Sequence, residues 1–281
     1  MKIAILVHTN LNNYLMTHLG QLWAGQGHSV TLVTGLDQKL PPADILVMHI
    51  DMTVVPPDYA EAVKSHPLVI NRNIPDISKH LFSQILLNPA DAYSGPVIVK
   101  TKNNCGGLPE MRLRIDPAKL QEVLNAQTTW DKVEGMVHYP IFDSLQQVPP
   151  SIWKNKHLIV EKFLPERSDD GHFFVREWIF LGTREIHFMN ISPAPIVKGK
   201  NVIRREYLPP DSVPAELEAL RKKMGFDYGK FDYVMYNGKP VLLDVNRTPG
   251  APPDLSDRSG AVDRVAQLSV GLEYYLPKMA R

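Results

Sequence analysis

The sequence predicts a mixed α/β chain, α+β when taken as a whole, whose N-terminal part is built on a parallel sheet. Over the first eighty or so residues, short β-branched runs alternate with runs of helical periodicity, which is typical of strand–helix–strand units. From about Asn88 onward, separated strands and proline-rich turns indicate a different kind of domain. The length of 281 residues and the hydrophobic content of 44% are enough for about two folded domains, each with its own core.

Periodicity and chain-breaking residues define the N-terminal elements. Leucines at helical spacing predict a helix over residues 11–23 that ends at Gly25, and a shorter helix is expected over residues 59–63. The strands are expected at residues 3–7, 30–33, 44–48 and 68–70. The turn after the first strand carries Thr9 and Asn10 in place of a G-x-G-x-x-G fingerprint, so no nicotinamide-type cofactor is expected there.

The rest of the chain is predicted to form strands joined by turns, together with two helices. Pro214 and Gly225 define the first turn and the end of one helix, and Asn237 with Gly238 is a typical hairpin turn. The helices are expected at residues 215–224 and 262–272. The strands are expected at residues 97–100, 136–141, 158–163, 178–181, 186–191, 231–236 and 241–245.

The hairpin carries two aspartates and an asparagine in otherwise apolar strands. Asp244 and Asn246 share one strand face, about 7 Å apart, because side chains alternate along a strand. A two-residue loop would set Asp232 opposite Leu243 on the other face, whereas a three-residue loop or one bulge sets it opposite Asp244. We expect the second register. Isolated acids lie more often on a solvated face, but hard oxygen donors grouped in this way favour Mg²⁺ or Mn²⁺.

Residues 230–250 resemble the C-terminal motif of the ATP-grasp superfamily, in which an acid on one strand, an acid on the next and an asparagine two residues later hold magnesium ions. The resemblance extends to carboxylate–amine ligases similar to the ribosomal-protein glutamate ligase. It implies an ATP-grasp fold with an N-terminal Rossmann-like domain, and it assigns Asp232, Asp244 and Asn246 to the metal. Asp244 stands where the family more often has glutamate.

The same resemblance implies an ATP site. Lys79 and Lys100 would bracket the phosphates, and the loop that carries Lys102, Gly106 and Gly107 would cover them, since small residues let backbone amides approach phosphate. The hinge residues that would face the adenine are Glu161, Lys162, Phe163 and Leu164.

The sequence motifs identify the acid that would bind the ribose less directly. Glutamate-adding members of the family carry it two residues before an arginine, but here Phe174 stands two residues before Arg176. Glu166 is therefore expected to take this role, with Asp169 and Asp170 as alternatives.

Two arginines are the catalytic candidates under this resemblance. Arg176 and Arg205, the latter in preference to Arg204, would offset charge on the transferred phosphoryl group. The implied activity is an ATP-dependent ligation of a small-molecule carboxylate to an amine, or to a thiol, through an acylphosphate, with release of ADP and phosphate. Two alternatives stay open: a small-molecule kinase on the same nucleotide platform, and an ATP-binding protein without turnover.

The resemblance divides the chain into three parts. Residues 1–88 would form the Rossmann-like domain, residues 89–164 the small lobe that covers the nucleotide, and residues 165–281 the metal-binding lobe. The acceptor pocket would be built from the N-terminal lobe and residues 254–259.

Composition argues against several classes of protein. Thirty-one basic residues balance thirty acidic ones, so no strong field favours nucleic acid. The single cysteine, Cys105, cannot form an internal disulfide and is expected to be a small loop residue, which fits a cytoplasmic location. No run of eighteen apolar residues suggests a membrane span. The sequence leaves a homodimer open.

Overall fold

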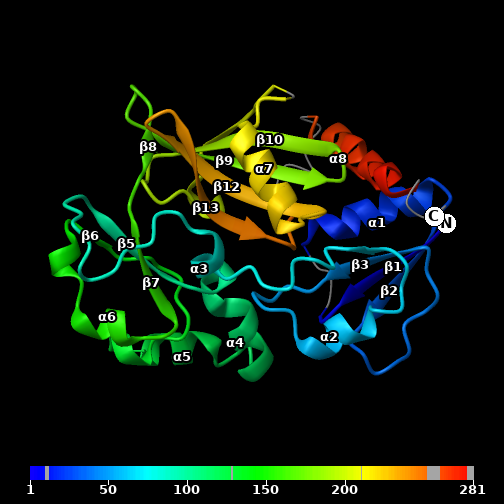
Figure 1. Ribbon diagram of the computed structural model, residues 1–281, viewed down its shortest axis with the longest axis horizontal. Coiled ribbons are helices and arrows are strands. Elements are labelled where there is room, and N and C mark those ends of the chain that lie inside the picture. Colours follow the sequence, from blue (N-terminus) through cyan, green and yellow to red (C-terminus); the bar gives the residue numbers. More distant parts are fainter. Residues whose placement is uncertain (10–12, 128, 210, 252–259, 277–281) are drawn as a thin grey trace.

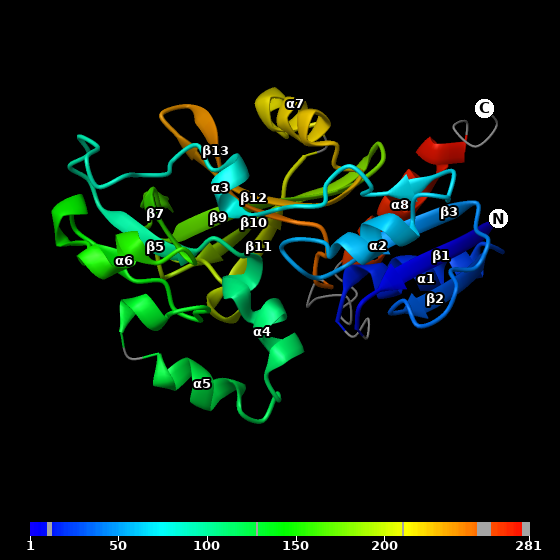
Figure 2. The ribbon, with the colours of Figure 1, turned by 60° about the horizontal axis from the view of Figure 1, so that its bottom comes forward.

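The structure is a computed structural model that describes residues 1–9, 13–127, 129–209, 211–251 and 260–276 (Figure 1). It contains a four-stranded sheet, a six-stranded sheet and a three-stranded sheet. Helices cover the sheets, so the predicted α/β class is confirmed. In Figure 2 the small sheet and the N-terminal sheet lie on either side of the large sheet, with α4 (Leu108–Arg114) between them.

The N-terminal sheet is parallel, with the strand order β2-β1-β3-β4. Its strands are β1 (Lys2–Val7), β2 (Ser29–Thr34), β3 (Ile45–His49) and β4 (Val69–Ile70). Because side chains alternate along β1, Ile3 and Ile5 pack in the core that contains α1 (Leu15–Gly25), whereas Leu6 packs on the other face, near α2 (Pro57–Ala62). All four predicted strands and both helices are present.

Helix α1 begins later than the sequence predicts. Tyr14 has an extended backbone and pairs with Gly250 in an isolated bridge, and Leu15 N donates to Pro249 O at 3.0 Å. This strand-like pairing with the segment after the hairpin holds Tyr14 in an extended conformation, so the helix starts at Leu15. Leu11, where the prediction placed the start, lies outside the described residues.

The large sheet is antiparallel, with the order β11-β10-β9-β12-β13 and β8 paired to β9. Its strands are β8 (Glu166–Arg167), β9 (Phe173–Leu181), β10 (Arg184–Ser192), β11 (Arg204–Tyr207), β12 (Tyr228–Tyr236) and β13 (Lys239–Asn246). Helix α7 (Ala215–Met224) has the predicted bounds and ends at Gly225, whose φ of 73° suits glycine. Leu217 of α7 packs with Trp178 and Phe231 of the sheet in one core.

The small sheet has the order β6-β5-β7 and is also antiparallel. Its strands are β5 (Val97–Thr101), β6 (Ile141–Phe142) and β7 (Leu158–Lys162). The strand predicted over residues 136–141 is therefore wrong except at its end. Met136 N instead donates to Gly106 O at 2.9 Å, which bends this segment against the glycine loop.

Short helices complete the structure. They are α3 (Lys79–Phe82), α5 (Leu120–Ala126), α6 (Pro150–Lys154) and α8 (Ala261–Ser269). Helix α8 packs against α1, where Trp23 Nε1 donates to Ser269 O at 3.0 Å, and both helices share a core with the large sheet. None of the helices that the structure describes combines the length and the apolar character needed to cross a membrane.

The hairpin of β12 and β13 has the predicted register. Tyr236 pairs with Lys239, so the turn is the two-residue Asn237–Gly238 with φ angles of 50° and 75°. A bulge between Asp232 and Tyr233 then shifts the pairing by one residue and sets Asp232 opposite Asp244.

His187 on β10 is a buried histidine whose protonation opposes folding. Its Nε2 lies 2.8 Å from Tyr233 Oη and its Nδ1 lies 2.8 Å from Ser212 Oγ. Burial, with a smaller effect of Arg176, lowers the pKa of His187 from 6.5 to about 4. Between these two values the unfolded chain binds more protons than the folded chain, so stability falls as the pH falls through this window.

We expect His187→Gln, which keeps a polar side chain but does not titrate, to flatten this dependence. Thermal unfolding measured at pH 7 and pH 5 should show a fall in Tm that is roughly 4–8 °C smaller in the variant than in the wild type, the change that about 2 kcal/mol produces in a chain of this size. Equal falls in both proteins would contradict the assignment.

Candidate nucleotide and metal site

A cavity of about 310 Å³ lies between the small sheet and the large sheet. Its lining comes from α3, β5, the β7–β8 segment, the loop after β10 and three strands of the large sheet. The charged residues of this lining are Lys79, Lys100, Lys162, Glu166, Glu177, Lys198, Lys230, Asp232 and Asp244. A larger cavity, about 970 Å³, lies beside α7 and is lined by none of the predicted site residues. The smaller cavity is therefore where the predicted lysines and aspartates meet.

Three carboxylates lie side by side on three neighbouring strands, on one face of the large sheet. Asp232 on β12 is paired with Asp244 on β13 on one side and with Glu177 on β9 on the other. Burial raises the pKa of Asp232 to about 7; Glu177 and Asp244 add repulsion, and Lys230 opposes the shift. The strands thus concentrate negative charge at one point of the cavity.

Lys230 compensates two of these carboxylates. Its Nζ lies 2.9 Å from Asp232 Oδ1 and 2.9 Å from Glu177 Oε2. Burial alone would lower the pKa of Lys230, but the two carboxylates together raise it, so its ammonium group stays charged. Sequence reasoning missed Lys230 and Glu177. The Lys-x-Asp spacing could have revealed Lys230, because residues two apart in a strand share a face.

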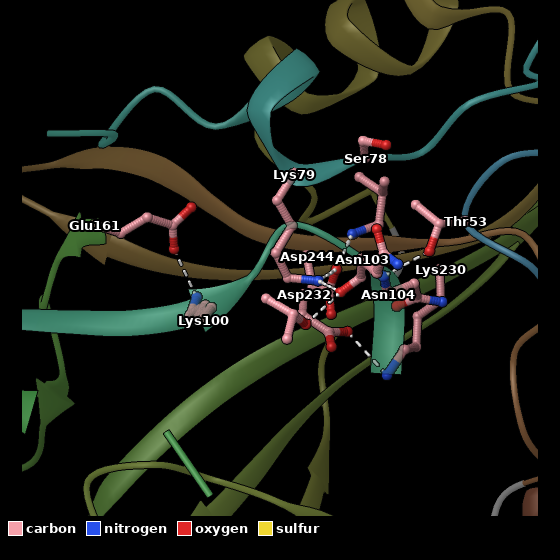
Figure 3. A network of polar contacts seen from close by, with 12 residues as sticks. Thr53, Ser78, Lys79, Lys100, Asn103, Asn104, Glu161, Lys230, Asp232 and Asp244 are labelled. Atoms are coloured by element: carbon pink, nitrogen blue, oxygen red, sulfur yellow. Dashed lines mark hydrogen bonds and ion pairs between the residues drawn. The ribbon is translucent and has the colours of Figure 1, made fainter. Parts of the chain in front are cut away.

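Lys79, the first residue of α3, compensates the third carboxylate (Figure 3). Its Nζ donates to Asp244 Oδ1 at 3.0 Å and to Asn103 O at 3.2 Å. The Lys79 side chain is only 2% exposed. Burial alone would lower its pKa, but Asp244 raises it above the usual value.

Lys100 forms a separate ion pair within the small sheet. Its Nζ lies 2.8 Å from Glu161 Oε2 on the neighbouring strand, and Glu161 is 1% exposed. Glu161 was predicted to face the adenine, but it does not line the cavity. In the hinge, Lys162 N donates to Ile85 O and Phe163 N to Pro96 O, both at 2.9 Å, and Lys162, Phe163 and Leu164 line the cavity.

The glycine loop lies beside the cavity and does not line it. Gly106 and Gly107 have positive φ angles, and a Cβ on Gly106 would lie 2.1 Å from Met136 O, so only glycine fits. Lys102 is tied to α3 by its carbonyl, which accepts from Lys79 N at 2.9 Å. Although Cys105 is exposed, neighbouring protein atoms desolvate its thiol and raise its pKa to about 12, which argues against a thiolate nucleophile.

Glu166 is the candidate ribose acid that reaches the cavity. Its Oε2 accepts from Met235 N at 2.7 Å and forms an ion pair with Arg176. Asp170 instead accepts from Ser168 Oγ and His172 N within its own turn. Arg176 does not line the cavity; it lies behind Glu166 and orients it.

Arg205 also lies outside the cavity lining. Its Nε donates to Asn190 Oδ1 at 3.0 Å, and Asn190 Nδ2 donates to Glu177 Oε1 at 2.7 Å. Since Glu177 holds Lys230, Arg205 is linked to the site through two intermediate side chains.

Asn246 is held by the turn that follows it. It lies two residues after Asp244 and opposite Lys230. Its Oδ1 accepts from Thr248 N at 2.8 Å, and Thr248 Oγ1 donates to Asp51 Oδ1 at 2.7 Å. Of the three predicted metal ligands, only the two aspartates line the cavity.

The donor set fits a hard divalent cation. Two opposed carboxylates face the cavity, with one amide oxygen two residues further along β13. In the part of the chain that the structure describes, no group of three or more histidine, cysteine, aspartate and glutamate side chains converges to hold a metal. The remaining ligands of Mg²⁺ or Mn²⁺ would therefore be phosphate oxygens and water.

Comparisons with known proteins identify solved structures that are similar to this one. No family model matches the chain, and no curated protein matches it. Solved structures do match. A RimK domain ATP-grasp protein from Sphaerobacter thermophilus is 13% identical, with a TM-score of 0.53 over 97% of this chain and 100% of the other. A RiPP-associated ATP-grasp ligase from Chryseobacterium gregarium, solved with ADP and a leader and core peptide, is 11% identical, with a TM-score of 0.56 over 96% and 95%.

A third solved structure agrees with these two. The macrocyclase MdnC from Microcystis aeruginosa, bound with the precursor peptide MdnA, is 11% identical, with a TM-score of 0.53 over 97% of this chain and 100% of the other. At such low identities the likeness concerns the fold. The chain has the ATP-grasp fold, as its sequence predicts.

The buried Lys100–Glu161 pair gives a test of the site's electrostatics. We expect Lys100→Met to destabilise the protein by about 3–5 kcal/mol, because it leaves the Glu161 carboxylate buried without a partner. The double variant Lys100→Met/Glu161→Met should recover most of this loss. Urea unfolding measures both; a double variant as unstable as the single one would show that the two charges are not coupled.

Proposed function

We propose that this chain is an ATP-dependent ligase that activates a carboxylate as an acylphosphate and joins it to an amine or thiol, with release of ADP and phosphate. The cavity between the two sheets is the observation that supports this most directly, because buried lysines face two opposed aspartates there. This arrangement of charges suits a triphosphate and its divalent cation. The ATP-grasp fold, which the chain shares with ligases, supports the same function.

The nucleotide would lie along the cavity with its base at the apolar end. Ile98, Leu164, Val234 and Leu243 line that end and would enclose a purine. The main chain around Leu164 would read the polar edge of the base. Glu166, which Arg176 holds in place, would accept hydrogen bonds from the ribose hydroxyls.

The phosphates would lie at the charged end of the cavity. Lys79 and Lys100 would contact them, and Asp232, Asp244 and Asn246 would hold Mg²⁺ against them. The bound cation would supply neutralisation of phosphate charge. Lys230, already fixed between two carboxylates, adds a further positive charge on the same face.

The reaction needs no nucleophilic side chain. A carboxylate oxygen of the first substrate attacks the γ-phosphorus while the bond to ADP breaks; the amine then attacks the acyl carbon, loses a proton and displaces phosphate. The chain's contribution is to position the reactants and to offset negative charge. Because neither Arg176 nor Arg205 lines the cavity, we assign both a positioning role, through Glu166 and through Asn190 with Glu177.

Mass spectrometry of the protein with ATP, Mg²⁺ and a pooled library tests the reaction type. The library should contain small acids, amines and peptides, because two of the structural neighbours were solved with peptides. We expect a product lighter than its two precursors by one water, with ADP and phosphate formed in equal amounts. A product that retains the phosphoryl group would indicate a kinase instead, and bound ATP without ADP formation would indicate a protein without turnover.

Removing one proposed metal ligand tests the site itself. Asp244→Asn keeps the shape but removes the charge, and we expect it to lower ADP formation by about 10²-fold or more, because the cation would lose one of two opposed carboxylates. Asp263→Asn, at an exposed aspartate of α8, is the matched control and should retain full activity. Undiminished turnover in Asp244→Asn would remove Asp244 from the metal site.

A further inference from the structure

Every acid that lines the cavity has a cationic partner from the same chain. Glu166 is paired with Arg176, Glu177 and Asp232 share Lys230, and Asp244 is paired with Lys79. Each carboxylate of the cavity lining is therefore in contact with an ammonium or guanidinium group, and a free divalent cation would have to compete with that group. A cation that approached Asp244 would meet the Lys79 ammonium group at 3.0 Å from the same carboxylate.

The two lysines beside the aspartates differ in how firmly they are held. Lys230 contacts two carboxylates and projects from the nine-residue strand β12, which is paired on both sides. Lys79 contacts one carboxylate and one neutral carbonyl, that of Asn103, and projects from the first residue of a four-residue helix. Withdrawing Lys79 from the acids therefore breaks only one ion pair.

A triphosphate supplies what is needed to withdraw Lys79. Its negative oxygens compete with Asp244 for the ammonium group, and its cation takes the place that Lys79 leaves on the carboxylate. A free divalent cation brings no anion that could bind the Lys79 ammonium group. It would have to displace Lys79 from Asp244 against the repulsion between the two positive charges.

We infer that Lys79, which would contact the phosphates, also closes the metal site before they bind, so that the site takes a metal–nucleotide complex and not a free divalent cation. The inference rests on the proposed function, because it concerns the same cavity. A site closed in this way makes metal and nucleotide binding cooperative. By linkage, each ligand then raises the binding affinity of the other by the same factor. Lys79 contributes part of this cooperativity, and that part should be lost when its charge is removed.

Binding of Mn²⁺ in the absence of nucleotide, followed by electron paramagnetic resonance, tests the inference. We expect Lys79→Met to tighten Mn²⁺ binding at least about 10-fold relative to the wild type, equivalent to ~1.4 kcal/mol. Lys79→Gln, which can still donate to Asn103 O, should show the same gain and serves if the methionine variant does not fold. Lys79→Arg, which keeps the charge, should bind Mn²⁺ as weakly as the wild type.

Two controls separate this effect from a general change of charge. Lys198 lines the same cavity, but its ammonium group donates to Val137 O at 2.5 Å and lies 4.1 Å from the centre of the Tyr139 ring. Lys198→Met should therefore leave the Mn²⁺ affinity unchanged within about 2-fold. Adding Asp244→Asn to Lys79→Met should remove the gain.

The outcomes distinguish the inference from the proposed function. If the wild type binds Mn²⁺ with ADP but neither uncharged variant gains affinity for Mn²⁺ alone, the inference is overturned and the proposed function stands. A gain of equal size in Lys198→Met would also overturn it. If the uncharged variants gain Mn²⁺ affinity but no protein binds ADP with Mn²⁺, the metal site is supported and the proposed nucleotide site fails.

Discussion

The pairing of Asp232 with Asp244 across one bulge is the constraint on which the site depends. Without the bulge, the two-residue turn would set Asp244 opposite Phe231, on the face that packs under α7 among aromatic rings. The bulge returns Asp244 to the face of the cavity, where three carboxylates then lie side by side on three strands. Such a row is unfavourable without cations, and this explains why lysines from several elements converge on it.

Those cations come from parts of the chain that are far apart. Lys79 precedes the small sheet, and Lys230 belongs to the large sheet; Lys100, which is paired with Glu161, reaches the same cavity from the small sheet. The site is therefore complete only when the lobes are assembled. Buried polar residues fix that assembly: Asn71 Nδ2 donates to Tyr228 O at 2.8 Å, and Arg247 Nη1 donates to Ile74 O at 2.6 Å.

Much of the fold follows from the sequence because its signals are local. Alternating runs mark the parallel strands, and Asn237–Gly238 marks the turn of the hairpin. The strand predicted over residues 136–141 fails because Gly106 draws Met136 away from the sheet, which is a contact between distant segments. Likewise β9 starts at Phe173 and not at residue 178, since its first half is partly buried by neighbouring elements that the sequence does not reveal.

The residues of the site also divide into those that local sequence motifs predict and those whose place depends on contacts between distant segments. Lys79, Lys100, Asp232 and Asp244 could be proposed from motif order, and they line one cavity. The spacing of Lys230 from Asp232 indicates a shared strand face, but the burial of Lys230 and Glu177 depends on which strands become neighbours, and the sequence does not reveal this. Arg176 and Arg205 were proposed as contacts to phosphate, but neither lines the cavity. Arg176 is linked to it through Glu166, and Arg205 through Asn190 and then Glu177.

The docking of α8 against α1 has a consequence for how the molecule is made. Helix α1 buries Trp23 against Ser269, 246 residues further along the chain. The apolar side of α1 can find that partner only after the residues between them have been synthesised. During that interval the nascent N-terminal unit exposes apolar surface, and such surface is where chaperones bind and where aggregation starts.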